Sequence, residues 1–188
     1  MKGMKKSNKG KYKYHLLYIC LGNNPTIYRE LIYSLLSFNK VAGNWTKENV
    51  EIIIFTDDEI ELPDGVFDLL SIQIKTVSKD MISEWVKSCN DFFLIVKARI
   101  LADFLESTDT NALLVDTDTF FMKDPKDLFE KVSKGELIMH LKEHKISKRA
   151  EMIGYFNKNK FKLINGEAFS IGSDCEMWNS GVIGINSS

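Results

Sequence analysis

The stretch LLVDTDTFF, residues 113–121, places two carboxylates directly after a run of apolar residues. One threonine separates Asp116 from Asp118, so both side chains project from the same face if the segment is extended. Two neighbouring negative charges repel each other unless a divalent cation, a basic side chain or solvent lies between them. Mg²⁺ or Mn²⁺ would give the pair a chemical role, because hard cations prefer oxygen ligands and often join carboxylates to substrate phosphates.

The same motif supports two other interpretations. Aspartates favour strand ends and turns for structural reasons alone. LLVDTDTF also fits the motif of haloacid dehalogenase-type phosphatases, in which the first aspartate attacks phosphorus and the second serves as acid and base. That motif usually opens the catalytic domain and is followed by a second acidic pair on a later strand. Here more than a hundred residues precede Asp116, and FSIGSDCEMW at 169–178 supplies neither an apolar strand nor the second acid of that pair.

Composition indicates one soluble globular domain. The 188 residues are 44% hydrophobic and 27% charged, and the net charge of −1 gives no nucleic-acid-binding signature. The cysteines at 20, 89 and 175 are odd in number and lack metal-ligand spacing, which favours the reducing cytoplasm. No apolar run has the length of a transmembrane helix.

The first thirteen residues, MKGMKKSNKGKYK, hold six lysines and no acid. Such a composition cannot bury a core, so we expect a flexible basic tail over residues 1–13. Its functional interpretation is weak contact with an anionic membrane surface, which would make the cytoplasmic protein peripheral to a membrane.

From Tyr14 onward, apolar strands alternate with amphipathic helices. The periodicity predicts strands at 14–20, 50–56, 69–77, 112–118, 136–141 and 178–186, and helices at 26–38, 79–88, 91–107 and 124–132. Residues 142–162 are rich in basic side chains and are predicted to form a surface helix or loop. Two buried helical stripes are expected, comprising Ile27, Leu31, Leu35 and Phe38 in the first helix and Phe93, Val96, Ile100 and Phe104 in the third.

This order of elements predicts an α/β fold with a mainly parallel sheet covered by helices on both faces, forming one domain over residues 14–188. Ligands of such folds gather outside the carboxyl ends of the strands, which is where Asp116 and Asp118 fall. The chain stops at Ser188 directly after a predicted strand, without a closing helix, so we expect the domain to be incomplete at its carboxyl end.

Three stretches resemble nucleotide-sugar glycosyltransferases of the GT-A fold, which is Rossmann-like, and particularly the glycogenin-like family eight enzymes. The stretch at 96–129, VKARILADFLESTDTNALLVDTDTFFMKDPKDLF, is similar to their A-R-L helix, D-x-D strand and following D-L-F segment. WNSGVIGIN at 178–186 is similar to their N-[SA]-G strand, and YICLGNNPTIYRELIYSLLSF at 18–38 to their first nucleotide-binding unit. Together the three motifs are far more specific than D-x-D by itself.

The resemblance implies a UDP-sugar or similar donor, a Mn²⁺ or Mg²⁺ ion and a saccharide, lipid or protein acceptor. By it, Asp118 ligates the metal and Asp116 shares the ion or contacts the ribose, with Thr117 between them in the donor site. The remaining donor contacts that it implies are Leu21, Gly22 and Asn23 near the base and ribose, Arg99 at the donor, and Asn179 at the transferred sugar. From spacing, Arg99 could instead pair with Asp103, and Asn179 could belong to a turn.

Two features depart from the family pattern. The family's third metal ligand is a histidine far beyond the N-[SA]-G strand, whereas His15, His140 and His144 have different surroundings. The acidic residue that usually follows the first strand is absent from LGNNP, residues 21–25. We therefore expect a metal-dependent glycosyltransferase, with two alternatives left open: a haloacid dehalogenase-type phosphatase that uses Asp116 and Asp118, and a domain that binds nucleotide-sugars without turnover.

Overall fold

The structure, a computed structural model, describes residues 12–65, 67–68, 70–89, 91, 93–158, 161–162 and 166–187. Residues 1–11 of the predicted basic tail lie outside this described part. The chain forms two compact units, one comprising residues up to Ile138 together with Gly181–Ser188, and the other comprising Met139–Ser180. Each unit is considered by itself below.

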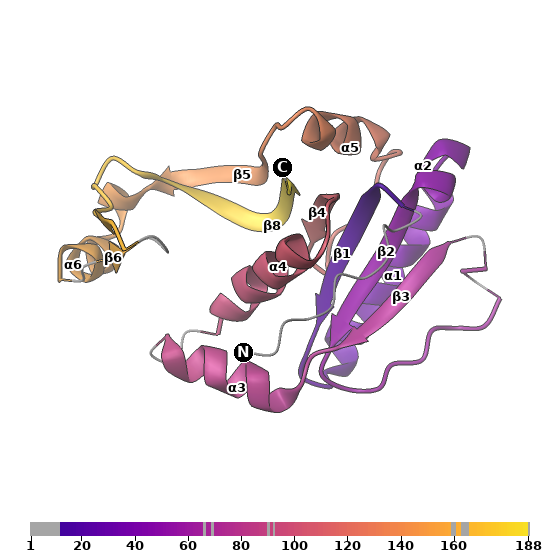
Figure 1. Ribbon diagram of the computed structural model, residues 1–188, viewed down its shortest axis with the longest axis horizontal. Coiled ribbons are helices and arrows are strands. Elements are labelled where there is room, and N and C mark those ends of the chain that lie inside the picture. The colour runs from indigo at the N-terminus through magenta and orange to yellow at the C-terminus, as the bar shows by residue number, and fades with distance from the viewer. Residues whose placement is uncertain are drawn as a thin grey trace. The chain divides into compact units, whose positions relative to one another are not determined.

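The described elements are strands and helices in alternation (Figure 1). The strands are β1 (Tyr14–Cys20), β2 (Val50–Thr56), β3 (Ser71–Thr76), β4 (Asn111–Val115), β5 (Ile138–Lys145), β6 (Phe161–Lys162), β7 (Ala168–Phe169) and β8 (Glu176–Asn186). The helices are α1 (Pro25–Val41), α2 (Asn44–Asn49), α3 (Lys79–Ser88), α4 (Ile95–Ser107), α5 (Lys126–Ser133), α6 (Ala150–Lys158) and the short 3-10 helix η1 (Ile146–Lys148).

The main sheet has the strand order β3-β2-β1-β4-β8-β5. Strand β1 pairs in parallel with β2 on one side and with β4 on the other, and β2 pairs in parallel with β3. Strand β8 runs antiparallel to β4, with Val115 opposite Val182. The predicted α/β fold with a mainly parallel sheet is therefore confirmed.

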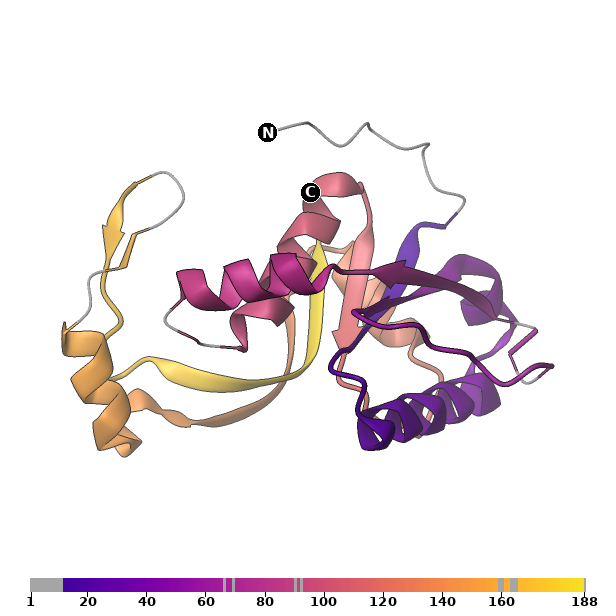
Figure 2. The same cartoon turned by 90° about the horizontal axis from the view of Figure 1, so that it is seen from below.

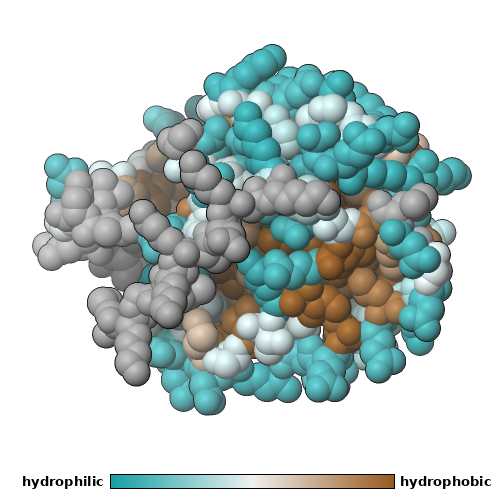
Figure 3. All heavy atoms as spheres, turned by 45° about the vertical axis from the view of Figure 1, so that its right-hand side comes forward, coloured by the Kyte–Doolittle hydropathy of each residue, from teal (hydrophilic) through white to brown (hydrophobic). Residues whose placement is uncertain are grey.

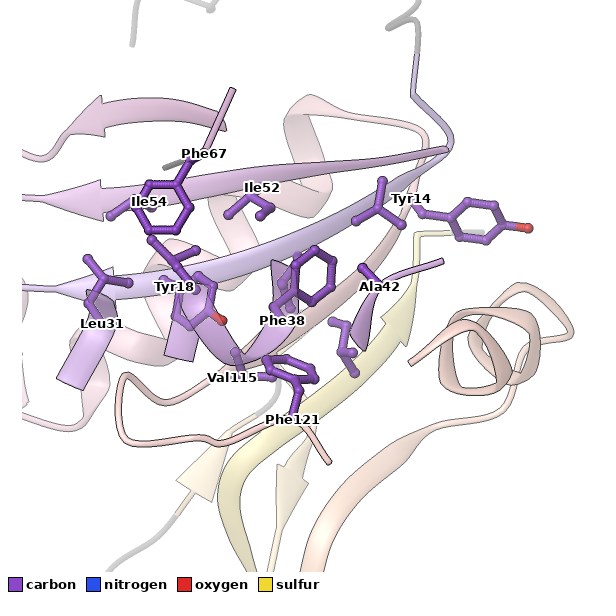
Figure 4. Packing of buried hydrophobic residues seen from close by; sticks show 14 of the residues in the cluster. Tyr14, Tyr18, Leu31, Phe38, Ala42, Ile52, Ile54, Phe67, Val115 and Phe121 are labelled. Carbon is purple, nitrogen blue, oxygen red and sulfur yellow. The ribbon is translucent and has the colours of Figure 1, made fainter. Parts of the chain in front are cut away.

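Helices cover both faces of the parallel part of the sheet, with α1 on one face and α3 and α4 on the other (Figure 2). Central strands buried on both faces need apolar residues at nearly every position, which explains the runs in β1 and β2. The predicted stripe of α1 packs against this sheet, with Leu31 and Phe38 buried (Figure 4). Leu35 is also buried, and Ile27 is partly buried.

The buried stripe predicted for the third helix is correct at Val96, Ile100 and Phe104 but wrong at Phe93. Helix α4 begins at Ile95, so Phe93 precedes it and is 56% exposed. The hydrophobic side of α4 packs on the sheet face opposite α1 and forms a second core cluster.

Helix α2 was not predicted from the sequence, because NWTKEN is short and largely polar. Its first turn is held by a residue far along the chain. The carboxylate of Asp124 accepts a hydrogen bond from the Gly43 amide at 2.7 Å and another from the Thr46 hydroxyl at 2.5 Å. A β-carbon at position 43 would lie 2.8 Å from Asp124, so glycine allows this close approach.

The unit of residues 139–180 contains most of β5, η1, α6, the β6–β7 pair and the first part of β8. Residues 142–162, predicted as a surface helix or loop, begin with the end of strand β5 and continue through η1 into α6. Ile146 is buried, and its amide donates to the Cys175 carbonyl at 2.9 Å. HLKEH at 140–144 lies in strand β5, which excludes the helix that a zinc-protease H-x-x-E-H signature requires.

The exterior combines charged and apolar areas. Figure 3 shows one face on which hydrophobic residues, in brown, gather between hydrophilic residues in teal. Within the described residues, no helix is both long and apolar enough to cross a membrane.

Candidate functional site

The predicted site residues that follow β1 and β4 lie at the same edge of the sheet. Leu21, Gly22 and Asn23 follow the last residue of β1, and Asp116 follows the last residue of β4. Because β1 and β4 are parallel neighbours in register at Leu17 and Leu114, their carboxyl ends lie at the same edge. The chain continues from β1 to β2 and β3 on one side and returns with β4 on the other, so this is the switch point at which α/β sheets bind ligands.

The loop between β1 and α1 is tightly shaped. Gly22 and Asn23 both have positive φ angles, of 90° and 41°. The Gly22 amide donates to Asp57 Oδ1 at 2.8 Å, and Asn24 caps α1 by accepting from the Thr26 amide at 2.9 Å. Asp57, directly after β2, thus places a carboxylate next to the β1–α1 loop, whose own polar side chains are asparagines.

A cleft of about 340 Å³ opens beside this loop at the carboxyl ends of β1 and β2. Asn23, Asn24 and Tyr28 line it on the α1 side, and the Tyr28 hydroxyl donates to the Glu61 carbonyl. The other lining residues are Cys20, Pro25, Thr56, Asp58, Glu59, Ile60 and Glu61. The cleft is therefore rich in hydrogen-bonding groups, and its charged lining residues are all acidic.

Cys20 lines this cleft and is buried. Burial, and secondarily the Asp57 carboxylate, raises the pKa of the Cys20 thiol. The thiol therefore stays protonated at neutral pH and acts as a small apolar lining group. All three cysteines of the chain are free thiols.

The residues after β4 form a turn, which corrects the extended conformation predicted for 112–118. The strand ends at Val115, and the Thr119 amide donates to the Asp116 carbonyl at 3.0 Å. Thr117 is buried, with its hydroxyl 3.5 Å from Glu30 of α1, whereas Asp116 is partly buried and Asp118 is exposed. Thr117 is therefore the buried residue of the turn, and the two carboxylates are its more accessible groups.

Asp116 already has a basic partner. The Lys97 ammonium, from α4, donates to Asp116 Oδ1 at 2.5 Å, and the two side chains are 20% and 40% exposed. The Asp116 amide also donates to the Gly181 carbonyl at 2.9 Å. The sequence left open a divalent cation, a basic side chain or solvent as the partner of the two carboxylates. In the structure, a basic side chain holds one oxygen of Asp116.

Arg99 and Asn179 are the two predicted site residues that do not follow β1 or β4: Arg99 lies in α4 and Asn179 in β8. Arg99 lies on the exposed side of α4, and no ion pair joins it to Asp103 within that fully described helix, so the alternative role suggested by spacing is absent. Asn179 belongs to the unit of residues 139–180. Its amide interacts there with His140 Nδ1 at 3.1 Å and donates to Glu143 at 3.2 Å.

The donor set after β4 fits a divalent cation only in part. Asp118 is exposed, and Asp116 can offer a ligand the carboxylate oxygen that Lys97 does not hold. Many Mg²⁺ or Mn²⁺ sites consist of one or two protein carboxylates together with substrate phosphates. Among the described residues, no group of three or more His, Cys, Asp or Glu side chains could hold a metal ion. A cation here would therefore need phosphate or water ligands, and it would compete with Lys97 for Asp116.

Sequence reasoning missed Asp57 and Lys97. Asp57 stands in FTDDE at the end of a predicted strand, so the rule that ligands gather at strand ends could have singled it out. Lys97 precedes Arg99 by two residues in VKAR, but nothing in the spacing tells which basic side chain of the helix reaches the carboxylates.

No protein-family model and no curated protein sequence matches the chain. Among solved structures, the chain is similar to the apo form of mouse xyloside xylosyltransferase 1, with a TM-score of 0.57 and 14% sequence identity over 93% of this chain and 66% of that one. It is also similar to the galactosyltransferase LgtC in complex with donor and acceptor sugar analogues, with a TM-score of 0.54 and 14% identity over 92% of this chain and 58% of that one. The chain has the GT-A glycosyltransferase fold. It spans less than two thirds of the length of each of these proteins.

These similarities extend over most of the chain and agree with the fold expected from the sequence. At 14% sequence identity, these similarities show that the backbone fold is shared. The finer resemblance to glycogenin-like enzymes therefore stays a prediction from the motifs, as do the roles of the individual site residues.

Proposed function

We propose that the chain acts as a metal-dependent glycosyltransferase that moves a sugar from a nucleotide-diphosphate donor, a UDP-sugar, to an acceptor. The observation that carries the proposal is the placement of a nucleoside-sized cleft and two carboxylates on either side of the β1 end, at the switch point of a GT-A fold. The two similar solved structures described above are both of glycosyltransferases.

The cleft beside the β1–α1 loop suits the nucleoside part of the donor. Its asparagines and Tyr28 offer hydrogen-bonding groups to a base and a ribose, and its volume lies in the usual range for small-molecule sites. Its acidic residues Asp58, Glu59 and Glu61 repel phosphate groups. We therefore infer that the diphosphate would lie away from the cleft, towards the turn after β4.

Asp118 and Asp116 would hold Mn²⁺ or Mg²⁺ at that turn. When bound, the ion neutralises the charge that develops on a diphosphate leaving group. Asp118 is the principal ligand in this proposal because it is exposed, whereas one oxygen of Asp116 is held by Lys97. The Lys97 ammonium keeps the Asp116 carboxylate in place and adds a positive charge close to the expected phosphates.

Calorimetric titration with UDP in the presence and absence of Mn²⁺ tests the proposal. We expect UDP binding that needs Mn²⁺ in the wild-type chain and that falls by at least about tenfold in Asp118→Asn, because a carboxylate ligand is lost. Asp103→Asn removes an exposed acid from α4 and serves as the matched control, with unchanged binding. Equal affinities of Asp118→Asn and wild type would remove Asp118 from the metal site.

The ion pair between Lys97 and Asp116 favours a second candidate, a domain that binds a nucleotide-sugar without a metal. In that case the ammonium takes the place of the cation next to the diphosphate. Lys97→Met separates the two candidates in the same titration. A metal site predicts that UDP binding by the variant still requires Mn²⁺, and a metal-free site predicts loss of UDP binding without any dependence on Mn²⁺.

A further inference from the structure

An exposed apolar surface is formed by α1 and the segment after the Asp116–Thr119 turn. Tyr33 and Leu36 of α1 are 68% and 41% exposed, and Phe120 and Met122 of the following segment are 53% and 82% exposed. These four residues are called the α1 patch below. Large apolar side chains that gather in this way on a surface mark a site of interaction.

The two parts of the α1 patch are fixed to each other. Phe121 lies between the exposed Phe120 and Met122 but points inward, where its ring packs edge-on against Phe38 at 5.3 Å (Figure 4). The Phe121 amide donates to the buried Ser37 hydroxyl at 2.9 Å. The rings of Tyr33 and Phe120 are 6.1 Å apart. The apolar side chains are therefore presented outward by an ordered backbone.

The exposed charged residues in the two segments that form the α1 patch are mainly basic. Arg29, Tyr33, Leu36 and Lys40 recur at helical spacing and share one exposed stripe of α1, with a basic residue at each end. Lys123 follows Met122 and is also exposed. The structure describes residues 25–41 and 116–124 completely. Within these segments three basic residues are exposed, whereas Asp118 is the one exposed acid.

We propose that the α1 patch docks the protein on an anionic lipid surface. Tyr, Phe, Met and Leu side chains can enter the boundary between headgroups and acyl chains, and basic side chains at the rim can reach anionic headgroups. Lysine is depleted from protein–protein interfaces, so an apolar patch rimmed by Lys40 and Lys123 fits lipid better than a protein partner. The six lysines of residues 1–13 would add electrostatic attraction to the same surface.

Co-sedimentation of the 188-residue chain with lipid vesicles tests this docking. We expect partitioning onto vesicles that contain about one third phosphatidylserine, and much weaker partitioning onto pure phosphatidylcholine. Phe120→Ser/Met122→Ser should reduce partitioning onto the anionic vesicles by at least about tenfold, because two apolar side chains no longer enter the lipid. Leu137→Ser, which removes an exposed apolar side chain elsewhere, should leave partitioning unchanged.

The design separates the patch from the tail. Attraction through the lysines of residues 1–13 alone would give vesicle binding that the double variant retains, and this result would overturn the proposal. So would an absence of binding to both kinds of vesicle. A wild-type chain that elutes as a dimer in gel filtration, and a double variant that elutes as a monomer, would assign the patch to a second copy of the chain instead.

Discussion

Asp116 and Asp118 are chemically alike in the sequence but differ in the structure. Asp116 is partly buried, and its amide donates a hydrogen bond to β8 while its carboxylate accepts one from Lys97. Asp118 is exposed on the turn. The motif could predict that two carboxylates lie together at a strand end. It could not predict their difference, because that depends on which helix packs beside β4 and how far its lysine reaches.

His15, in the second position of β1, is a buried titratable group that the proposed function does not use. Its Nδ1 lies 2.6 Å from the Thr110 hydroxyl and its Nε2 lies 3.2 Å from Glu51. The carboxylate favours a protonated ring, but burial and the nearby Lys75 ammonium oppose it and lower the pKa of His15 to about 4. The Thr110 hydroxyl has two acceptors within reach, His15 Nδ1 and the Lys13 carbonyl at 2.9 Å. When it donates to Nδ1, the neutral ring keeps Nε2–H to donate to Glu51.

This buried histidine predicts a pH-dependent stability. Between pH 6.5 and about 4 the unfolded chain binds a proton that the folded ring does not, so the free energy of unfolding decreases as the pH falls through this window. The contribution is fully present above pH 6.5, and up to about 3 kcal/mol is lost at its lower end. In urea titrations from pH 7.5 to 4.5, His15→Gln should lack this part of the decrease. Parallel pH profiles for variant and wild type would contradict the assignment.

At the scale of elements, strands and long helices followed directly from the sequence. The predicted bounds of the first two strands and of α3 match those observed, because apolar runs and Ser78 as N-cap are local signals. Helix α2 escaped prediction because its support comes from Asp124, 78 residues after Thr46. The weaker predictions thus fall where stability depends on contacts between distant segments.

Asp124 links two helices and predicts a measurable loss of stability. Its carboxylate accepts from Gly43 and Thr46 at the start of α2 and from the Lys126 amide at the start of α5, at 3.0 Å. Asp124→Ala should lower the free energy of unfolding by about 2 kcal/mol, because three donors lose their acceptor. Asp127→Ala, an exposed acid in the first turn of α5, should cost less than about 0.5 kcal/mol. Equal stabilities of the two variants in urea unfolding would show that Asp124 does not hold the helices together.

At the scale of the whole molecule, the α/β class, the parallel sheet and the edge that carries the candidate site could be predicted from alternation and strand composition. The antiparallel β8 and the division into two units could not, because both depend on contacts between segments that are far apart in the sequence. For the same reason, the sequence could group Asn179 with the donor site only through a family resemblance.

The central claim is that the turn after β4 binds a cation together with a nucleotide diphosphate. A crystal of the chain grown with MnCl2 and UDP, with data collected at the manganese absorption edge, tests it most directly. We expect an anomalous peak within about 2.0–2.4 Å of Asp118, contacting the diphosphate, with the nucleoside in the cleft beside Tyr28. UDP bound elsewhere, or no manganese at the turn while Lys97 holds Asp116, would contradict the account.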